Sequence, residues 1–154
     1  YLPYQKNCGI VIQDKRKGRF IMILIAVVDD NMGLCFNHRR LSRDKILSEK
    51  IMELTDGKVV WMSSYSAKMF GVKYHQINVD DNFLRETAKG EYCFTETEDP
   101  VIAERWIEKI ILFRWNRHYP ADTFFTIDLN SWKLETTEEF QGNSHEKITM
   151  EVYD

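Results

Sequence analysis

Cysteine is scarce in this chain of 154 residues. The three cysteines, Cys8, Cys35 and Cys93, cannot all pair with one another and show no spacing typical of a metal site. The four histidines are scattered as well, without the His-x-His-x-Asp-His cluster that a zinc nuclease requires. We therefore expect free thiols in a reducing cytoplasm and no bound metal.

Long apolar runs are also absent. The run IMILIAVV, residues 21–28, is too short to cross a membrane and is closed by Asp29 and Asp30. Basic residues precede it, as in a signal peptide, but no small-residue cleavage site follows. The sequence thus predicts neither a membrane partner nor an export signal.

Positive charge is in short supply outside the first 21 residues. Residues 22–154 carry 16 basic and 23 acidic side chains, a net charge of −7, which is too acidic for binding nucleic acid through charge alone. Residues 1–21 hold five basic side chains and one acidic side chain. This asymmetry predicts a basic N-terminal extension, residues 1–21, ahead of one globular domain, residues 22–154.

The basic extension has two interpretations. Arg16-Lys17-Gly18 back-translates to AGG-AAA-GGA, a purine run similar to a bacterial ribosome-binding site, and Met22 follows a few codons later. In the first interpretation, natural translation begins at Met22 and residues 1–21 are not native. In the second, residues 1–21 are a flexible basic extension of the natural protein.

One stretch at the start of the domain organises the rest. Residues 23–28 are typical of a strand buried on both faces, and residues 29–33 end it. Ser42 is a suitable N-cap for a helix over about residues 43–54. Asp44 then falls in the first turn of that helix, where the helix dipole favours an ionised carboxylate.

Strand and helix patterns alternate along the rest of the chain. Strands are expected at residues 58–62, 74–79, 91–94, 110–113, 123–127, 132–140 and 147–153. Helices are expected at residues 63–70, at 80–88 with Asp80 and Asp81 as its caps, and at 100–106 after an Asp99-Pro100 start. Gly142-Asn143-Ser144 is expected to form the turn between the last two strands. This order predicts an α/β domain with a mixed, mainly parallel central sheet, flanking helices and a C-terminal antiparallel hairpin.

Five segments of the sequence resemble motifs of dihydrofolate reductases and occur in the same order as in that family. They are ILIAVVDDNMG, LSRD, KVVWM, EYCFTETEDPVIAERWIEKIILF and DTFFTIDLNSWKLETTEEFQGNSH. The chain therefore resembles a truncated, divergent member of the dihydrofolate reductase family over about residues 22–152. The resemblance implies that fold, and it places Asp44 where the family has the acid that contacts the pterin.

The family's cofactor motifs are replaced in this chain. Residues 95–97, Thr-Glu-Thr, stand where the family has the glycine pair that admits the cofactor pyrophosphate, and a glutamate there would repel phosphate. Ser63, Ser64, Tyr65 and Ser66 stand in place of the Gly-Arg-x-Thr that holds the 2′-phosphate of NADPH. The three serines either bind an anion at a helix N-terminus or simply cap the helix. We expect no cofactor, and NADPH is not expected to bind in the usual mode.

A second group of candidate site residues is mostly cationic. Its members follow the first strand, follow the central strand or lie in the closing turn: Asn37, His38, Arg39, Arg40, Arg114, Arg117 and His145. The resemblance implies that the first-strand loop and the closing turn meet near Asp44. The two histidines would then serve with Asp44 as catalytic groups, or the cations would hold a nucleotide phosphate. The alternative is a set of surface residues paired with the excess acids.

Three functional hypotheses follow, and whether the chain is an enzyme stays open. The leading one is a bacterial, cytoplasmic dihydrofolate reductase-like protein that binds a pterin- or purine-like ring, or a nucleotide, at Asp44. The alternative is a metal-independent ribonuclease or RNA-phosphate-binding domain, since similar short chains are sometimes labelled ribonuclease Z. The third is an interaction module with exposed tryptophans, although the four tryptophans fit core positions better. The oligomeric state is not predicted.

The N-terminus of the native protein distinguishes the two interpretations of residues 1–21. If translation begins at Met22, mass spectrometry of the protein isolated from its natural host will find no peptide from upstream of that methionine. A native N-terminus before Met22 would refute the first interpretation.

Overall fold

The computed structural model describes residues 22–71, 74–87 and 90–154, so the basic extension and Cys8 lie outside the described residues. The strands are β1 Met22–Val28, β2 Gly33–Phe36, β3 Arg39–Arg40, β4 Val60–Met62, β5 Ile77–Val79, β6 Tyr92–Thr95, β7 Ile107–Arg114, β8 Thr123–Phe124, β9 Leu134–Phe140 and β10 Ile148–Tyr153. The α-helices are α1 Lys45–Leu54, α2 Ser64–Phe70 and α3 Phe83–Glu86. The 3₁₀ helices are η1 Pro100–Trp106 and η2 Leu129–Ser131.

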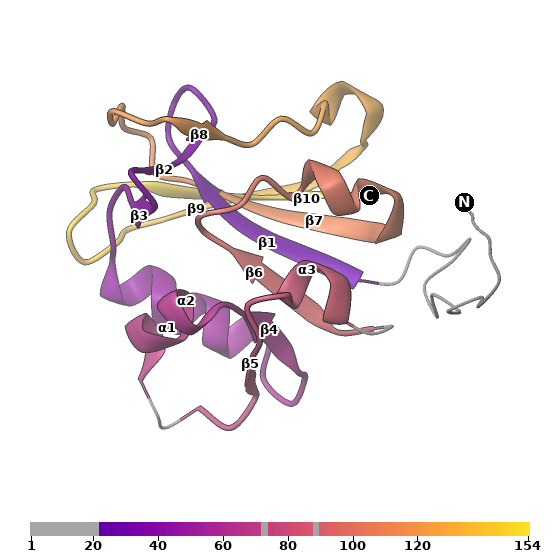
Figure 1. The fold of residues 1–154 in the computed structure, drawn as a ribbon. Coiled ribbons are helices and arrows are strands. Elements are labelled where there is room, and N and C mark those ends of the chain that lie inside the picture. The colour runs from indigo at the N-terminus through magenta and orange to yellow at the C-terminus, as the bar shows by residue number, and fades with distance from the viewer. Residues whose placement is uncertain (1–21, 72–73, 88–89) are drawn as a thin grey trace, which may run out of the picture.

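The strands form a large central sheet and a small second sheet (Figure 1). The central sheet has the order β5-β4-β6-β1-β7-β10-β9. β1 pairs in parallel with β6 and β7, and β4 pairs in parallel with β5 and β6. β10 runs antiparallel to both β7 and β9. The predicted fold class, a mixed and mainly parallel sheet ending in an antiparallel hairpin, is confirmed.

β1 separates two hydrophobic cores, one on each face of the sheet. On one face, Leu24 and Ala26 pack with Phe83 of α3. On the other face, Ile25 packs with residues of α1 and α2, including Ile51 and Phe70. Because successive strand residues point to opposite faces, a continuous apolar run is what such a strand needs. Each of these buried large side chains contributes about 1.5–3 kcal/mol of hydrophobic stabilisation.

The segment after β1 forms a hairpin where the sequence indicated only a polar loop. β2 and β3 pair with each other, and β2 also pairs with β8. Asn37 and His38 make the two-residue turn with φ values of 50° and 60°. Asparagine and histidine tolerate this left-handed conformation better than most residues, so the turn can form without glycine.

Two predicted helix caps are wrong. α1 begins at Lys45, and Asp44, not Ser42, is its N-cap, with an extended backbone at φ −149° and ψ 125°. α3 has Asn82 as its N-cap position, and the Asp81 carboxylate instead accepts the backbone N–H of Ser64 at the start of α2. At α1 the Asp44 carboxylate takes the orphan N–H groups that the sequence assigned to Ser42, whereas α3 has no side-chain cap bond at Asn82.

Two expectations about the whole chain can be compared with the described residues. No helix among them is long and apolar enough to cross a membrane. Within the same residues, Cys35 and Cys93 are buried free thiols, and no group of three or more potential metal ligands is clustered.

Asp29 organises the turn that ends β1. The residue is only 1% exposed, and its Oδ1 accepts the backbone N–H groups of Asn31 at 2.9 Å and Gly33 at 2.7 Å. Its Oδ2 accepts the N–H of Tyr119 at 3.0 Å, from a segment far away in the sequence. One buried carboxylate thus joins the loop after β1 to the loop after β7.

We predict that Asp29→Ala destabilises the fold by about 2–3 kcal/mol, because three backbone donors lose their acceptor. Asp30→Ala is the matched control, since Asp30 is exposed and its replacement should cost less than about 0.5 kcal/mol. Urea unfolding of both variants measures the difference. Equal stabilities would contradict this role of Asp29.

Candidate functional site

Asp44 stands at the N-terminus of α1, at the end of the loop that follows β3. Its Oδ1 accepts the backbone N–H groups of Ile46 at 3.0 Å and Leu47 at 3.3 Å. An aspartate is well suited to this N-cap position, because its carboxylate satisfies helical N–H groups that have no partner within the helix. The Asp44 side chain is fully buried.

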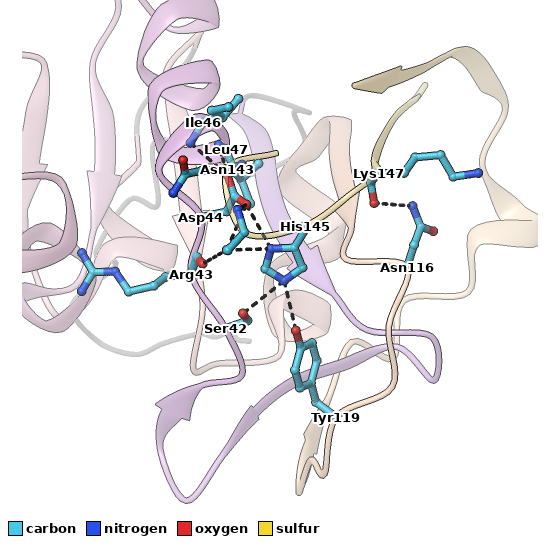
Figure 2. Close-up of polar contacts among 11 residues, drawn as sticks. Ser42, Arg43, Asp44, Ile46, Leu47, Asn116, Tyr119, Asn143, His145 and Lys147 are labelled. Atoms are coloured by element: carbon cyan, nitrogen blue, oxygen red, sulfur yellow. Dashed lines mark hydrogen bonds and ion pairs between the residues drawn. The ribbon is translucent and has the colours of Figure 1, made fainter. Parts of the chain in front are cut away.

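The closing turn, residues 142–145 between β9 and β10, lies directly on the Asp44 carboxylate (Figure 2). The Asn143 N–H donates to Oδ1 at 2.8 Å, and the Ser144 N–H donates to Oδ2 at 2.8 Å. The His145 ring nitrogen Nδ1 lies 3.0 Å from Oδ2, and the Ser144 hydroxyl lies 3.2 Å from the same Oδ2. Asp44 is therefore bound by a segment about a hundred positions later in the chain.

Gly142 allows this close approach. A Cβ atom at position 142 would lie 2.5 Å from the Asp44 Oδ2 and 2.9 Å from the Ile148 Cδ1, closer than real Cβ contacts. The Gly142 N–H donates to the His145 carbonyl at 2.9 Å and so closes the turn. The absence of a side chain at this position is what lets the turn rest on the carboxylate.

The His145 ring is buried among aromatic and hydroxyl groups. It stacks on the Trp115 ring, with centroids 4.5 Å apart and planes 25° apart. Because the Asp44 carboxylate can only accept, Nδ1 is the donor of that contact. Nε2 faces two hydroxyls, at 3.2 Å from the Ser42 Oγ and 3.0 Å from the Tyr119 Oη (Figure 2).

The electrostatics of the site keep Asp44 ionised. Burial alone would raise the pKa of this carboxyl group. The N–H donors of Asn143, Ser144 and Leu47, together with the His145 ring, instead hold its pKa well below the usual range, because they bind the charged form. The sequence favoured an ionised acid through the helix dipole, and in the structure direct hydrogen bonds to the carboxylate lower its pKa.

Within the described residues, the space directly beside the Asp44 carboxylate is too small for the ring that the resemblance places there. The cavity beside the carboxylate, lined also by Phe94 and Trp115, has a volume of only about 10 Å³, barely the space of one water. A shallower hollow of about 180 Å³ borders Asp44 between α1 and α2, with Phe70 and Tyr74 in its wall. A hollow of about 770 Å³ lies at the other end of β7, beside Ile107, and no predicted site residue lines it.

A second buried acid, Glu96, follows β6. Its carboxylate binds the Arg40 guanidinium through two contacts, from Nε at 2.9 Å and Nη2 at 3.0 Å. It also accepts the Ser66 hydroxyl at 2.8 Å, and the Arg40 guanidinium lies over the Tyr65 ring. Arg40, one of the predicted cationic ligands, is thus already paired within the chain.

The predicted serines at the start of α2 are also paired within the chain. Ser63 is the N-cap of α2 and accepts the Ser66 N–H at 3.1 Å. Ser64 donates its backbone N–H and its hydroxyl to Asp81. The capping interpretation therefore describes Ser63, and the chain's own carboxylates take the donors of Ser64 and Ser66.

The remaining cationic candidates do not gather at Asp44, contrary to the expectation from the resemblance. Asn37, His38 and Arg39 are exposed at the β2–β3 turn. Arg114 is bound to Glu151 at 2.7 Å, and Arg117 is exposed after β7. Of the two predicted catalytic histidines, the one in contact with Asp44 is His145.

Sequence reasoning missed three residues of this site. Trp115 and Tyr119 contribute the stacking face and one hydroxyl, and Ser42 contributes the other hydroxyl. No local motif marks Tyr119. In the sequence, Trp115 lies between the cationic candidates Arg114 and Arg117, so no pattern marked it as a stacking residue. The pairing of β7 with β1 and β10 brings it to Asp44.

Comparisons with known proteins show the fold. No family model matches the sequence. No curated protein matches it either. Among solved structures, the chain is similar to dihydrofolate reductase from Enterococcus faecalis complexed with NADP(H) and RAB-propyl. The TM-score is 0.60 at 9% sequence identity, over 88% of this chain and 96% of that chain. The chain has a dihydrofolate reductase-like fold, and at this identity the likeness establishes the fold alone.

We predict that Asp44 gives stability that depends on pH. Its pKa is lower in the folded than in the unfolded chain, so this stabilisation is present above the ordinary aspartate pKa of about 3.9 and is lost as the pH falls below it. Asp44→Asn should therefore lose less stability than the wild-type chain on acidification from neutral pH to about pH 3. Urea unfolding at several pH values tests this, and parallel pH profiles would contradict it.

Proposed function

We propose that this protein binds a planar, pterin- or purine-like ring through Asp44 and does not reduce folate with NADPH. The observation that carries the proposal is the pair of donors on the carboxylate. The Asn143 and Ser144 N–H groups approach one oxygen each, both at 2.8 Å. A ring with an amidine-like edge offers two N–H donors side by side, so Asp44 has the geometry to accept it in the same paired way.

The surroundings of Asp44 support a flat aromatic ligand. Trp115 already stacks a ring, the imidazole of His145, next to the carboxylate. Stacked aromatic pairs contribute about 0.5–1.5 kcal/mol beyond their area burial. The hollow between α1 and α2 borders the same acid and has Arg43 and Lys45 in its wall, which suit an anionic substituent such as a phosphate or carboxylate.

The cofactor side of the fold argues against NADPH in the mode of the family. The buried Glu96 carboxylate lies after β6, where a phosphate group of the cofactor would need to approach. Arg40 is occupied by Glu96, and the Ser64 N–H is occupied by Asp81. Donors that would hold a phosphate are thus already bound by acids, and the residues present do not fit this cofactor. We infer a binding protein or an enzyme of another class.

Calorimetric titration with pterins, folates and guanine nucleotides tests the proposed site. We expect at least one of these ring classes to bind the wild-type protein, and Asp44→Asn to weaken that binding at least tenfold. The loss follows because an amide presents one acceptor and one donor to two donors. Asp30→Asn, an exposed acid after β1, is the matched control and should bind as the wild type does. No binding, or binding unchanged in Asp44→Asn, would remove the proposal.

The ribonuclease or RNA-phosphate-binding function remains the alternative proposal, with less geometric support. It requires His38, Arg39, Arg40 and His145 to act on one phosphodiester. His145 is held between Asp44 and Trp115, and Arg40 is held by Glu96. Of these four residues, only His38 and Arg39 are exposed and open to a phosphate group.

Labelled RNA separates this alternative from ring binding. The ring-binding proposal expects the purified protein to leave the RNA intact, with or without EDTA. Cleavage that is insensitive to EDTA and lost in His38→Ala and His145→Ala would favour the ribonuclease instead.

A further inference from the structure

We infer that the closing turn, residues 142–145, is an internal occupant of the ring site, and that a ligand gains access to Asp44 by displacing it. This inference rests on the proposed function, because it concerns the regulation of the same site. The turn would make ring binding an exchange between two occupants of one carboxylate. A ligand must therefore compete with a contact that the chain makes with itself.

The carboxylate has no acceptor capacity to spare while the turn is in place. Oδ1 receives the N–H groups of Ile46, Leu47 and Asn143. Oδ2 receives the Ser144 N–H and lies within hydrogen-bond distance of the Ser144 hydroxyl and His145 Nδ1. A carboxylate offers about four lone-pair sites, and more donors than that surround this one. A ring cannot add to this arrangement, and it can only replace part of it.

The turn also reproduces the two features expected of a ring ligand. Its adjacent backbone N–H groups supply a paired-donor edge, and the His145 imidazole supplies a flat ring on the Trp115 face. The two caps from α1 would remain on the other side of Asp44 when the turn leaves. Displacement would thus free two donor positions and one stacking position together.

Fixed points on both sides of the turn, the hydrogen bonds of Asn116 and the end of β9, limit the part of the chain that has to move. On its far side, the Asn116 side chain donates to the Lys147 carbonyl at 3.2 Å (Figure 2). The same side chain donates to the Thr149 hydroxyl at 2.9 Å. On its near side, β9 ends at Phe140. The segment between these points is short, so the turn can swing away while β9 and β10 keep their pairing.

The number of N–H donors on a ligand decides how well it replaces the turn on the buried carboxylate. Removal of the turn leaves a buried carboxylate, whose desolvation penalises any occupant that does not replace the lost donors. A ring with two adjacent donors replaces both, whereas the same ring with one donor replaces only one. The turn therefore lowers the apparent affinity for both rings by the same factor, and the discrimination between them comes from the number of donors that each ring returns to the carboxylate.

Two variants weaken the turn while Asp44 itself stays unsubstituted. Gly142→Ala places a Cβ atom against the carboxylate, and His145→Ala removes the stacked ring and one donor. His38→Asn is the matched control, because His38 is exposed and asparagine keeps the left-handed turn. Circular dichroism establishes which variants are folded, and His145→Ala carries the test if Gly142→Ala does not fold.

The probes are pterin and its analogue without the 2-amino group. We expect pterin to bind the weakened-turn variants at least tenfold more tightly than the wild type, and His38→Asn to match the wild type. The des-amino analogue should bind more weakly than pterin to every chain. In the wild type, pterin should also speed hydrogen exchange at the Asn143 and Ser144 amides, since it releases them from Asp44.

Three other outcomes would each overturn the inference that the turn occupies the ring site. If the folded variants bind pterin no more tightly than the wild type, while Asp44→Asn loses binding, the ring site stands and the internal-occupant inference is overturned. Slower exchange at the two amides on binding would overturn it as well. If no chain binds pterin although the Asn143 and Ser144 amides exchange faster in the variants, the pterin form of the proposed function fails, and this inference fails with it.

Discussion

The contact between Asp44 and the closing turn is the interaction on which the site depends. It joins the start of α1 to the hairpin of β9 and β10, two parts of the chain about a hundred positions apart. An ionised carboxylate in a buried place is stable only when donors surround it, and this chain supplies them from its own backbone. The same donors fix the position of His145 and, through it, the contacts with Ser42 and Tyr119.

On the other side of the fold, acids of the chain also accept hydrogen bonds from the chain's own donor groups. Glu96 takes Arg40 and Ser66, and Asp81 takes Ser64. In each of these contacts, an acid of the chain accepts hydrogen bonds from donor groups of the same chain. The dihydrofolate reductase-like fold is kept, while Arg40, Ser64 and Ser66 are bound by acids of the chain itself. We regard this pattern as the physical reason to separate the fold of this protein from the reaction of its structural neighbour.

Much of the fold could be predicted from the sequence, because its signals are local. The apolar run of β1, the Asp99-Pro100 start of η1 and the Gly142 turn each carry a clear pattern, and each lies where it was expected. The β2–β3 hairpin was missed because its turn uses Asn37 and His38 without glycine. The caps of α1 and α3 were misassigned because several polar residues compete there, and tertiary contacts decide between them.

The site was harder to predict for a different reason. Asp44 and His145 were found because each lies in a recognisable string, but the expected cleft between them is filled by the contact that they make. Trp115 reaches the site through strand pairing, and Tyr119 through the bond of its backbone N–H to Asp29, neither of which a local pattern encodes. Whether a segment lines a cavity or fills it depends on backbone geometry at single residues such as Gly142.

The most direct measurement is the solution NMR spectrum of the backbone amides of Asn143 and Ser144 in the wild-type protein and in Asp44→Asn. If the turn rests on the carboxylate, both amide protons will resonate far downfield in the wild type and will lose that shift together in the variant. Amide shifts that are ordinary in the wild type, or that do not respond to the loss of the Asp44 charge, would contradict the account.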